Sequence, residues 1–281
     1  MRIAVTGGAG RVGRAVVGLA LAEGHTVVEI DRPAVAAAAP EPPPKLVRRP
    51  ADVTAYPELK RVLAGCEALV HLAAHPKPWG QPDHVVHNEN VTASYNALRA
   101  AAELGIERIC LASSVNAIGG GYSRNPRYDY FPVDERHPSY NEDPYSLSKW
   151  IVEAQADSFA RRYANLTIAS LRLHAVVRAR PSTPPARVHS DFAVRDLWGY
   201  TLSRSAARAC LLALTADFTG HEVFYIVAPQ TQHPRPSAEL CREHYPEVPI
   251  RGELRGNQAL YDCTKAERLL GWCHEDDGPA R

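Results

Sequence analysis

The chain has 281 residues with 32 basic and 31 acidic side chains, so its formal net charge is +1 at pH 7. A balance so close to neutral provides no general field that would attract nucleic acid or an anionic membrane surface, and we expect neither as a partner. Hydrophobic residues make up 45% of the chain and charged residues 22%, as in an ordinary globular protein.

Six cysteines are scattered along the chain without a C-x-x-C pair or a His/Cys cluster at the spacing of metal ligands. We interpret them as reduced structural residues and predict no metal site. No charged leader with an apolar segment stands at the N-terminus, and no apolar run approaches the ~20 residues that span a bilayer. These features favour a cytoplasmic protein.

The first predicted element is a strand, because the apolar run Ile3–Val5 leads directly into glycines spaced by two residues and then into a helical pattern over 11–23. The glycines are Gly7, Gly10 and Gly13. Glycine is needed where the backbone adopts positive φ or where a ligand approaches closely, and the helix N-terminus behind it offers unpaired N–H groups to a pyrophosphate. Strand, turn and helix in this order predict a dinucleotide-binding turn.

A second apolar run, 26–30, ends at Asp31, about 20 residues after the glycines, where a carboxylate would hold the adenosine ribose. The Asp31 carboxylate would repel the 2′-phosphate of NADP, which makes NAD the first expectation. An arginine near the ribose can accommodate that phosphate, so Arg32 and Arg11 leave NADP open.

The chain then alternates strands and helices as far as residue 173. The expected elements are a short strand near 46–48, a helix over 57–64, a strand over 68–72, a helix over 84–104, a strand over 106–112, a helix over 144–163 and a strand over 166–173. Residues 32–50 and 113–143 are expected to be loops. The alternation predicts an α/β fold with a doubly wound parallel sheet, whose ligands bind at the carboxyl ends of the strands.

The final third changes character. A proline-rich loop, Pro181–His189, is followed by an expected helix over 191–197, a helix over 205–216, a strand over 223–227 and two small helices over 236–244 and 264–270. These pieces are too short for a core of their own, so we place them as a lid over the sheet. We therefore divide the chain into a dinucleotide-binding domain over 1–173 and a small substrate-binding region over 174–281, interleaved with the sheet.

Tyr145 and Lys149 stand at the start of the helix over 144–163. Four residues apart, their side chains lie on one helical face. A phenol titrates near ~10, and a neighbouring ammonium lowers its pKa by stabilising the phenolate, so the pair is suited to take and give a proton. Ser114, after the strand over 106–112, offers a hydroxyl at the same edge of the sheet.

Five segments together resemble the extended branch of the short-chain dehydrogenase/reductase family, the NAD-dependent epimerase/dehydratase group, which has a Rossmann-type fold. They are Thr6-Gly7-Gly8-Ala9-Gly10-Arg11-Val12-Gly13, Asp52-Val53, His71-Leu72-Ala73-Ala74, Ser113-Ser114 and Tyr145-x-x-x-Lys149. The resemblance implies that Tyr145 is the catalytic acid/base, that Lys149 holds the nicotinamide ribose and lowers the tyrosine pKa, and that Ser114 polarises the substrate oxygen. The implied cofactor-binding residues are Gly7, Gly10, Arg11, Val12, Gly13, Asp31, Arg32, Asp52, Val53, Leu72, Ala73, Ala74, Asn90, Tyr145 and Lys149.

Within this group, Ser114-Val115-Asn116-Ala117-Ile118-Gly119 is similar to uronate dehydrogenases, which oxidise the anomeric carbon of a hexuronic acid. The implied substrate-binding residues are His75, Ser114, Val115, Asn116, Arg172 and His174. Arg172 would bind the carboxylate, although a structural role for it is equally expected. Val115 and Asn116 stand where sugar dehydratases carry an acidic pair, so dehydration is expected less than oxidation, reduction or epimerisation.

Three functions follow as hypotheses. The first is an NAD-dependent oxidoreductase that acts on a secondary alcohol or hemiacetal carbon of a small sugar-like substrate. The second is a sugar or nucleotide-sugar epimerase that retains NAD, and the third is a non-catalytic dinucleotide-sensing protein. Relatives in this group often dimerise through the two long helices, 84–104 and 144–163, so the resemblance also implies a homodimer.

Overall fold

The computed structural model describes residues 1–38, 40–180 and 186–274. Seven parallel strands form one sheet in the order β3-β2-β1-β4-β5-β6-β9. Their bounds are β1 Arg2–Thr6, β2 Thr26–Ile30, β3 Leu46–Arg48, β4 Ala68–His71, β5 Arg108–Ser114, β6 Thr167–Leu173 and β9 Gly220–Ile226. The order reverses between β1 and β4, which is where open α/β sheets bind their ligands.

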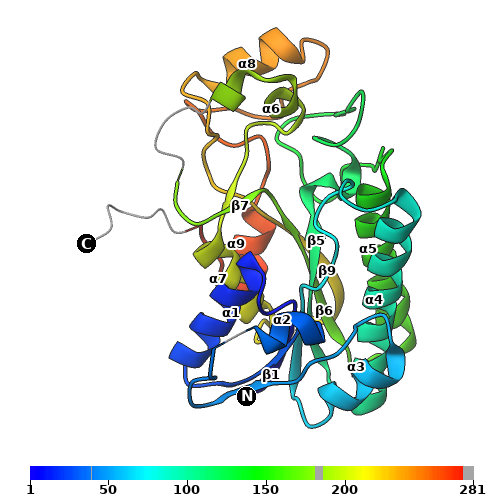
Figure 1. Ribbon diagram of the computed structural model, residues 1–281. Coiled ribbons are helices and arrows are strands. Elements are labelled where there is room, and N and C mark those ends of the chain that lie inside the picture. Colours follow the sequence, from blue (N-terminus) through cyan, green and yellow to red (C-terminus); the bar gives the residue numbers. More distant parts are fainter. Residues whose placement is uncertain (39, 181–185, 275–281) are drawn as a thin grey trace.

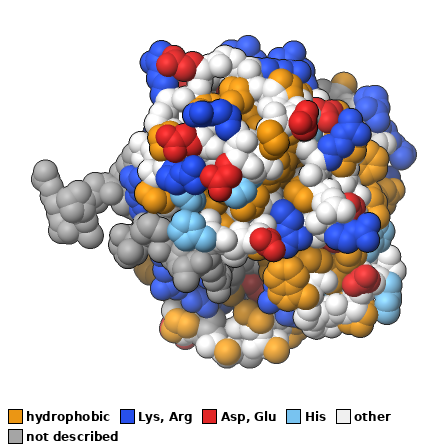
Figure 2. Space-filling view, turned by 90° about the horizontal axis from the view of Figure 1, so that it is seen from above, with side chains coloured by type: hydrophobic (Ala, Val, Ile, Leu, Met, Phe, Trp, Pro, Cys, Tyr) orange, Lys and Arg blue, Asp and Glu red, His pale blue; other side chains and the backbone are white. Residues whose placement is uncertain are grey.

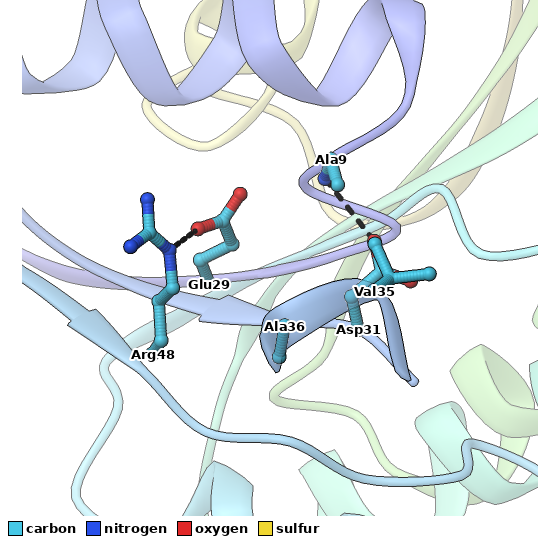
Figure 3. A pocket seen from close by; sticks show the side chains of 6 residues that line it. All are labelled: Ala9, Glu29, Asp31, Val35, Ala36 and Arg48. Carbon is cyan, nitrogen blue, oxygen red and sulfur yellow. Dashed lines mark hydrogen bonds and ion pairs between the residues drawn. The ribbon is translucent and has the colours of Figure 1, made fainter. Parts of the chain in front are cut away.

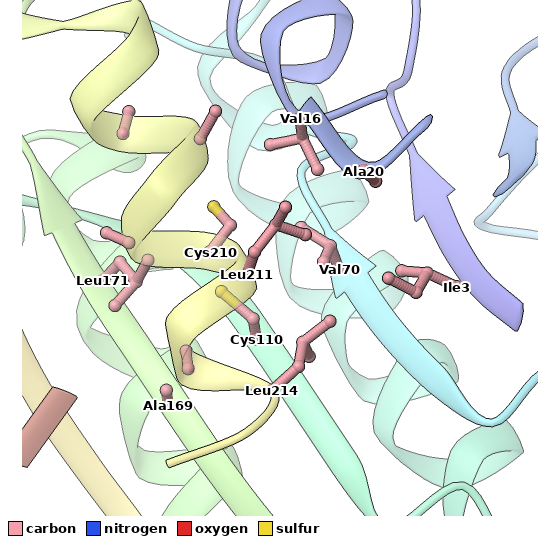
Figure 4. Packing of buried hydrophobic residues seen from close by; sticks show 14 of the residues in the cluster. Ile3, Val16, Ala20, Val70, Cys110, Ala169, Leu171, Cys210, Leu211 and Leu214 are labelled. Atoms are coloured by element: carbon pink, nitrogen blue, oxygen red, sulfur yellow. The ribbon is translucent and has the colours of Figure 1, made fainter. Parts of the chain in front are cut away.

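Helices cover both faces of the sheet, because its central strands are apolar on both sides and must be buried on both. On one face lie α1 (Arg11–Ala22), α7 (Ser203–Ala213) and α9 (Thr264–Leu270), and on the other α3 (Tyr56–Leu63), α4 (Asp83–Leu104) and α5 (Pro144–Arg162) (Figure 1). Figure 4 shows the first of these layers, where Leu211 of α7 and Leu214, the residue that follows α7, pack with Val16 of α1 against the strands. The expected doubly wound sheet is confirmed.

A smaller lobe stands above the carboxyl edge of the sheet, with α6 (Asp191–Arg195) and α8 (Ser237–His244) at the top of Figure 1. Its core joins residues from the loop before α5, such as Phe131 and Val133, with later residues such as Trp198 and Tyr261. Isolated bridges from Phe131 to Ile250 and from Val133 to Tyr261 tie the two segments together. The remaining described elements are α2 (Pro33–Ala37), η1 (Val115–Ile118), β7 (Val176–Val177), η2 (Ala186–His189) and β8 (Thr201–Leu202).

The structure differs from the sequence expectations mainly after residue 173. The strand expected near 223–227 is β9, which forms one edge of the sheet. The helix expected over 205–216 is α7, which packs beside α1 on one face of the sheet. Only part of the final third therefore lies above the sheet. Within the expected loop Pro181–His189, residues 181–185 lie outside the described residues.

Two local differences concern the site. The strand expected over 106–112 begins two residues later and continues through Ser114, so this serine is its last residue. A short helix, α2, forms inside the loop expected over 32–50, with Pro33 at its first position, where the missing N–H of proline costs nothing. Across the described residues, no helix has both the length and the apolar character needed to cross a membrane.

Candidate active site

The turn between β1 and α1 is shaped by its glycines. Gly7 has φ +68°, and a Cβ on it would lie 2.9 Å from the backbone nitrogen of Ala73. A Cβ on Gly13 would lie 2.2 Å from the Gly7 carbonyl oxygen. Gly10 caps α1 without a side-chain hydrogen bond, and the first turn of α1 carries no acidic residue. The turn thus presents an open helix N-terminus to an anion and fits the pyrophosphate of a dinucleotide.

Asp31, at the end of β2, faces this turn. Its carboxylate accepts hydrogen bonds from the backbone N–H of Ala9 at 3.1 Å and of Arg32 at 3.0 Å. The N–H of Ala51 donates to the Asp31 carbonyl at 3.0 Å, which brings Asp52 and Val53 to the same edge of the sheet. A pocket beside Asp31 is lined by Ala9, Glu29, Asp31, Val35, Ala36 and Arg48 (Figure 3). It lies where the ribose of a dinucleotide on the glycine turn would be expected.

The end of β4 forms the floor of the same region. Thr6 Oγ1 accepts the N–H groups of Leu72 and Ala73 at 3.2 Å each and bonds the ring of His71 at 2.8 Å. Burial, together with the nearby Lys149 ammonium, lowers the pKa of His71 to about 3, so this buried strand histidine is neutral. Gly7 approaches the backbone of Leu72 and Ala73 closely, so both residues meet the glycine turn, and their contact with a cofactor stays a prediction.

Other residues predicted to contact the cofactor have different surroundings. Arg11 donates from Nη1 to the carbonyl of Val176 on β7, and Val12 packs partly buried against the core beside α1. Asn90 has its side-chain amide engaged within the protein, because Oδ1 accepts from His75 N–H at 2.8 Å and Nδ2 donates to Ser148 Oγ at 3.0 Å. Asn90 therefore ties the loop after β4 to α5, and Ala74 lies exposed in that loop.

Ser114, Tyr145 and Lys149 come together at the carboxyl edge of the sheet. Asp143 caps α5 by accepting the N–H groups of Tyr145 and Ser146, which places Tyr145 in the first turn of that helix. The Ser114 hydroxyl is a neighbour of the Tyr145 phenol and acts to lower the pKa of that phenol. Lys149 Nζ lies 5.8 Å from the centre of the Tyr145 ring and donates to the Ala112 carbonyl at 2.8 Å. The structure thus unites the three residues that the sequence singles out.

Burial governs the protonation of this group. It raises the pKa of Tyr145 to about 12, even though the neighbouring Ser114 hydroxyl acts in the opposite direction. Burial also lowers the pKa of Lys149 to about 8, opposed by the charge of the Glu153 carboxylate. The expected lowering of the Tyr145 pKa is not found, because removing the phenolate from water outweighs the other influences.

Tyr122 covers Tyr145. Its ring meets the Tyr145 ring edge to face at a centroid distance of 5.6 Å. Trp79 contacts Tyr122 at 5.1 Å and Phe192 of α6 contacts it at 6.1 Å, and both outer rings are exposed, by 53% and 40%. Three separate segments thus supply an aromatic cover over Tyr145, which is why no local sequence pattern reveals it.

The residues predicted to bind substrate do not all face this space. Asn116 stands two residues after Ser114 and is 7% exposed, and its Oδ1 finds no hydrogen-bond partner among the described residues. Val115 packs in the core of the upper lobe. His75 bonds the exposed Glu89 at 2.7 Å, and His174 is buried with Nε2 2.9 Å from the carbonyl oxygen of Asp196.

Arg172 is occupied inside the protein. Its guanidinium forms a two-point ion pair with Glu153 of α5, at 2.9 and 2.8 Å, and also bonds the Tyr225 hydroxyl at 3.1 Å. Both partners of the ion pair have side chains less than 10% exposed, at 6% and 8%. Of the two roles expected for Arg172, the structure therefore supports the structural one, because Glu153 already supplies its carboxylate.

Comparisons with known proteins agree with this architecture. The model of the NAD dependent epimerase/dehydratase family matches residues 3–223. The UDP-glucose 4-epimerase of Corynebacterium glutamicum is 25% identical over 98% of this chain and 91% of its own length. A protein of Synechocystis sp. that carries the name of a dihydroflavonol 4-reductase is 30% identical over 64% of this chain, which spans about half (48%) of that relative.

Among solved structures, the glucuronic acid dehydrogenase of Chromohalobacter salexigens superposes with a TM-score of 0.71 at 21% identity, covering 98% of this chain and 84% of that one. This likeness concerns the fold. The family match, in contrast, covers the glycine turn, Ser114, Tyr145 and Lys149, and its description names NAD, which confirms the expected family and cofactor. The chain belongs to the NAD dependent epimerase/dehydratase family of enzymes.

Proposed function

We propose that this protein is an NAD-dependent oxidoreductase that moves a hydride between nicotinamide and a secondary alcohol or hemiacetal carbon of a small sugar-like substrate. The observation that carries the proposal is the meeting of Ser114, Tyr145 and Lys149 beside the open glycine turn. A phenol, an ammonium and a hydroxyl at the edge where α/β sheets bind ligands are suited to acid/base chemistry on an alcohol.

Each residue has a defined part in the reaction. The Ser114 hydroxyl, a neighbour of the Tyr145 phenol, orients the reacting oxygen of the substrate. During oxidation the substrate O–H proton passes to Tyr145 Oη while the carbon loses a hydride, and during reduction Tyr145 returns that proton. When bound, NAD supplies the hydride acceptor or donor. The buried Lys149 ammonium provides positive charge close to the phenolate that oxidation requires.

The substrate side favours hydroxyl groups over a carboxylate. Asn116 Oδ1 is a buried acceptor without a partner among the described residues, and such a group costs free energy until a donor reaches it. A sugar hydroxyl is a suitable donor. Because Arg172 is paired with Glu153, it gives no support to a uronic acid as substrate.

A second candidate function is an epimerase that retains NAD and returns the hydride to the opposite face. Its support is the 25% identity to the UDP-glucose 4-epimerase of Corynebacterium glutamicum over 98% of this chain. The two functions differ in net redox change. The test is a panel of sugars, uronic acids and nucleotide sugars with NAD⁺ and NADP⁺, followed at the nicotinamide absorbance and by product analysis. An oxidoreductase accumulates reduced cofactor, whereas an epimerase yields an isomer without it.

We also propose that the protein forms a homodimer through α4 and α5. Large hydrophobic side chains of these helices are exposed: Tyr95 by 47% and Trp150 by 45%. The two helices pack side by side on one face of the sheet (Figure 1). Pairing this face with a second copy would remove both aromatic rings from water, which stabilises association.

A further inference from the structure

The pocket beside Asp31 contains a second carboxylate, Glu29. This carboxylate forms an ion pair with Arg48, the one cationic side chain among the six lining residues. Glu29 Oε2 accepts a hydrogen bond from Arg48 Nε at 2.7 Å (Figure 3). The contact follows from the sheet register, because Glu29 on β2 and Arg48 on β3 are direct neighbours across the two parallel strands. The side chains are only 12% and 19% exposed, so water screens this pair weakly.

The guanidinium is also held from its other side. Arg48 Nη1 donates to the carbonyl of Pro40, in the loop that follows α2. Two of its nitrogen atoms are therefore committed inside the protein. An arginine recognises a phosphate through its positive charge and its planar fork of N–H groups. When the guanidinium is paired with a carboxylate, that charge is balanced and fewer of its N–H groups can reach a phosphate.

Glu29 is fixed against the glycine turn as well. A Cβ on Gly8 would lie 2.5 Å from Glu29 Cγ, so the side chain fills the space that this glycine leaves. Asp31, two residues further along β2, lies on the other side of the pocket and accepts the Ala9 N–H. The lining of the pocket thus contains two carboxylates and one arginine, and the charge of this arginine is balanced by Glu29.

We propose that Glu29 is a second determinant of NAD over NADP, acting by withholding Arg48 from the 2′-phosphate. The inference rests on the proposed function only in placing a dinucleotide on the glycine turn. Asp31 repels the phosphate directly, whereas Glu29 removes the cation that would otherwise attract it. The two effects act on the same oxygen atoms and are separable by substitution.

The test measures equilibrium binding of NAD⁺ and of NADP⁺ to the purified full chain by isothermal titration calorimetry, without any substrate. Glu29→Gln keeps the shape of the side chain and removes its charge. We expect it to raise the ratio of NADP⁺ affinity to NAD⁺ affinity about tenfold, as for one charged hydrogen bond gained. Adding Arg48→Gln to this variant should abolish the gain, whereas adding Arg32→Gln should preserve it.

An unchanged affinity ratio in a folded Glu29→Gln variant would overturn the proposal, and so would a gain that depends on Arg32. Asp31→Asn provides a second test that does not require the Glu29 variant to fold. We expect it to keep a preference for NAD⁺, and equal affinities for both dinucleotides would show that Asp31 acts alone. Failure of the proposed function is distinguishable: a chain that binds NAD⁺ but oxidises no sugar refutes the activity, while the affinity ratios still decide the role of Glu29.

Discussion

Glu153 and Arg172 are held together behind the active site by two hydrogen bonds, 2.9 Å from Nε to Oε1 and 2.8 Å from Nη2 to Oε2. Glu153 Oε1 also accepts the Ser113 hydroxyl at 2.5 Å, next to Ser114 at the end of β5. The pair therefore connects α5, which carries Tyr145 and Lys149, to two strands of the sheet. It explains why an arginine near the site is not available to substrate.

Replacing Arg172 alone should be costly. Arg172→Met leaves the Glu153 carboxylate buried without its cation, which destabilises a protein by about 3–5 kcal/mol. The double variant Arg172→Met/Glu153→Leu should recover most of this loss. Urea unfolding measures the free energy of unfolding of the single and the double variant. If Arg172 instead binds a substrate carboxylate, the single variant raises KM for uronic acids selectively, and stability changes little.

The glycine turn gives a matched pair of substitutions within α1. Gly13→Ala places a Cβ 2.2 Å from the Gly7 carbonyl oxygen and should abolish NAD⁺ binding by distorting the turn. Gly18→Ala meets nothing within 4 Å and should stabilise the protein by about 0.5–1 kcal/mol, because glycine is the less favourable residue inside a helix. Calorimetric NAD⁺ titration and thermal unfolding of both variants check the prediction. Retained NAD⁺ binding in Gly13→Ala would contradict the assignment of the glycine turn as the site that binds the dinucleotide.

Lys149 should reduce stability at neutral pH. Its folded-state pKa is lowered from 10.5 to about 8, so the charged form is disfavoured in the fold. Between pH 8 and pH 10.5 Lys149 is therefore more often protonated in the unfolded chain than in the folded one, so the free energy of unfolding rises with pH across this range. Relative to Lys149→Met, the wild type should gain about 3 kcal/mol between pH 7 and pH 10.5. Urea unfolding at both pH values tests this, and a difference independent of pH would refute it.

The proposed dimer predicts a specific effect of charge on its face. Trp150→Glu should convert a dimer into a monomer of 30.8 kDa, because a carboxylate cannot be buried in an apolar contact without a partner. Trp79→Glu is the control, since Trp79 is a comparably exposed tryptophan, at 53%, that belongs to the loop after β4 and not to either helix. Analytical ultracentrifugation reports the mass. A wild-type monomer at micromolar concentration would contradict the proposal.

The face of the molecule seen from above carries side chains of both charges. Figure 2 shows acidic and basic side chains interspersed with hydrophobic ones over the described part of this face. Both signs of charge are present on this face, as the count of 32 basic and 31 acidic residues leads one to expect.

Local sequence patterns were enough to predict the sheet, the glycine turn and the meeting of Tyr145 with Lys149. Each depends on neighbours or on a helical spacing of four residues. The partners of Arg172 and Asn90 were out of reach, because the interacting groups come from elements distant in the sequence. The Tyr145 pKa was predicted in the wrong direction, since burial cannot be read from spacing. The aromatic cover over Tyr145 could not be predicted either, because Trp79, Tyr122 and Phe192 come from three segments that are distant in the sequence.

Tyr145→Phe tests the central claim most directly, because it removes one hydroxyl from a buried ring and leaves the packing intact. We predict that turnover of the sugar oxidised by the wild type falls about 10²- to 10⁴-fold, while calorimetry shows that NAD⁺ binding is retained. Turnover equal to that of the wild type would contradict the role of Tyr145 as acid/base. So would a wild-type chain that binds NAD⁺ and turns over no substrate, which would leave the protein a dinucleotide sensor.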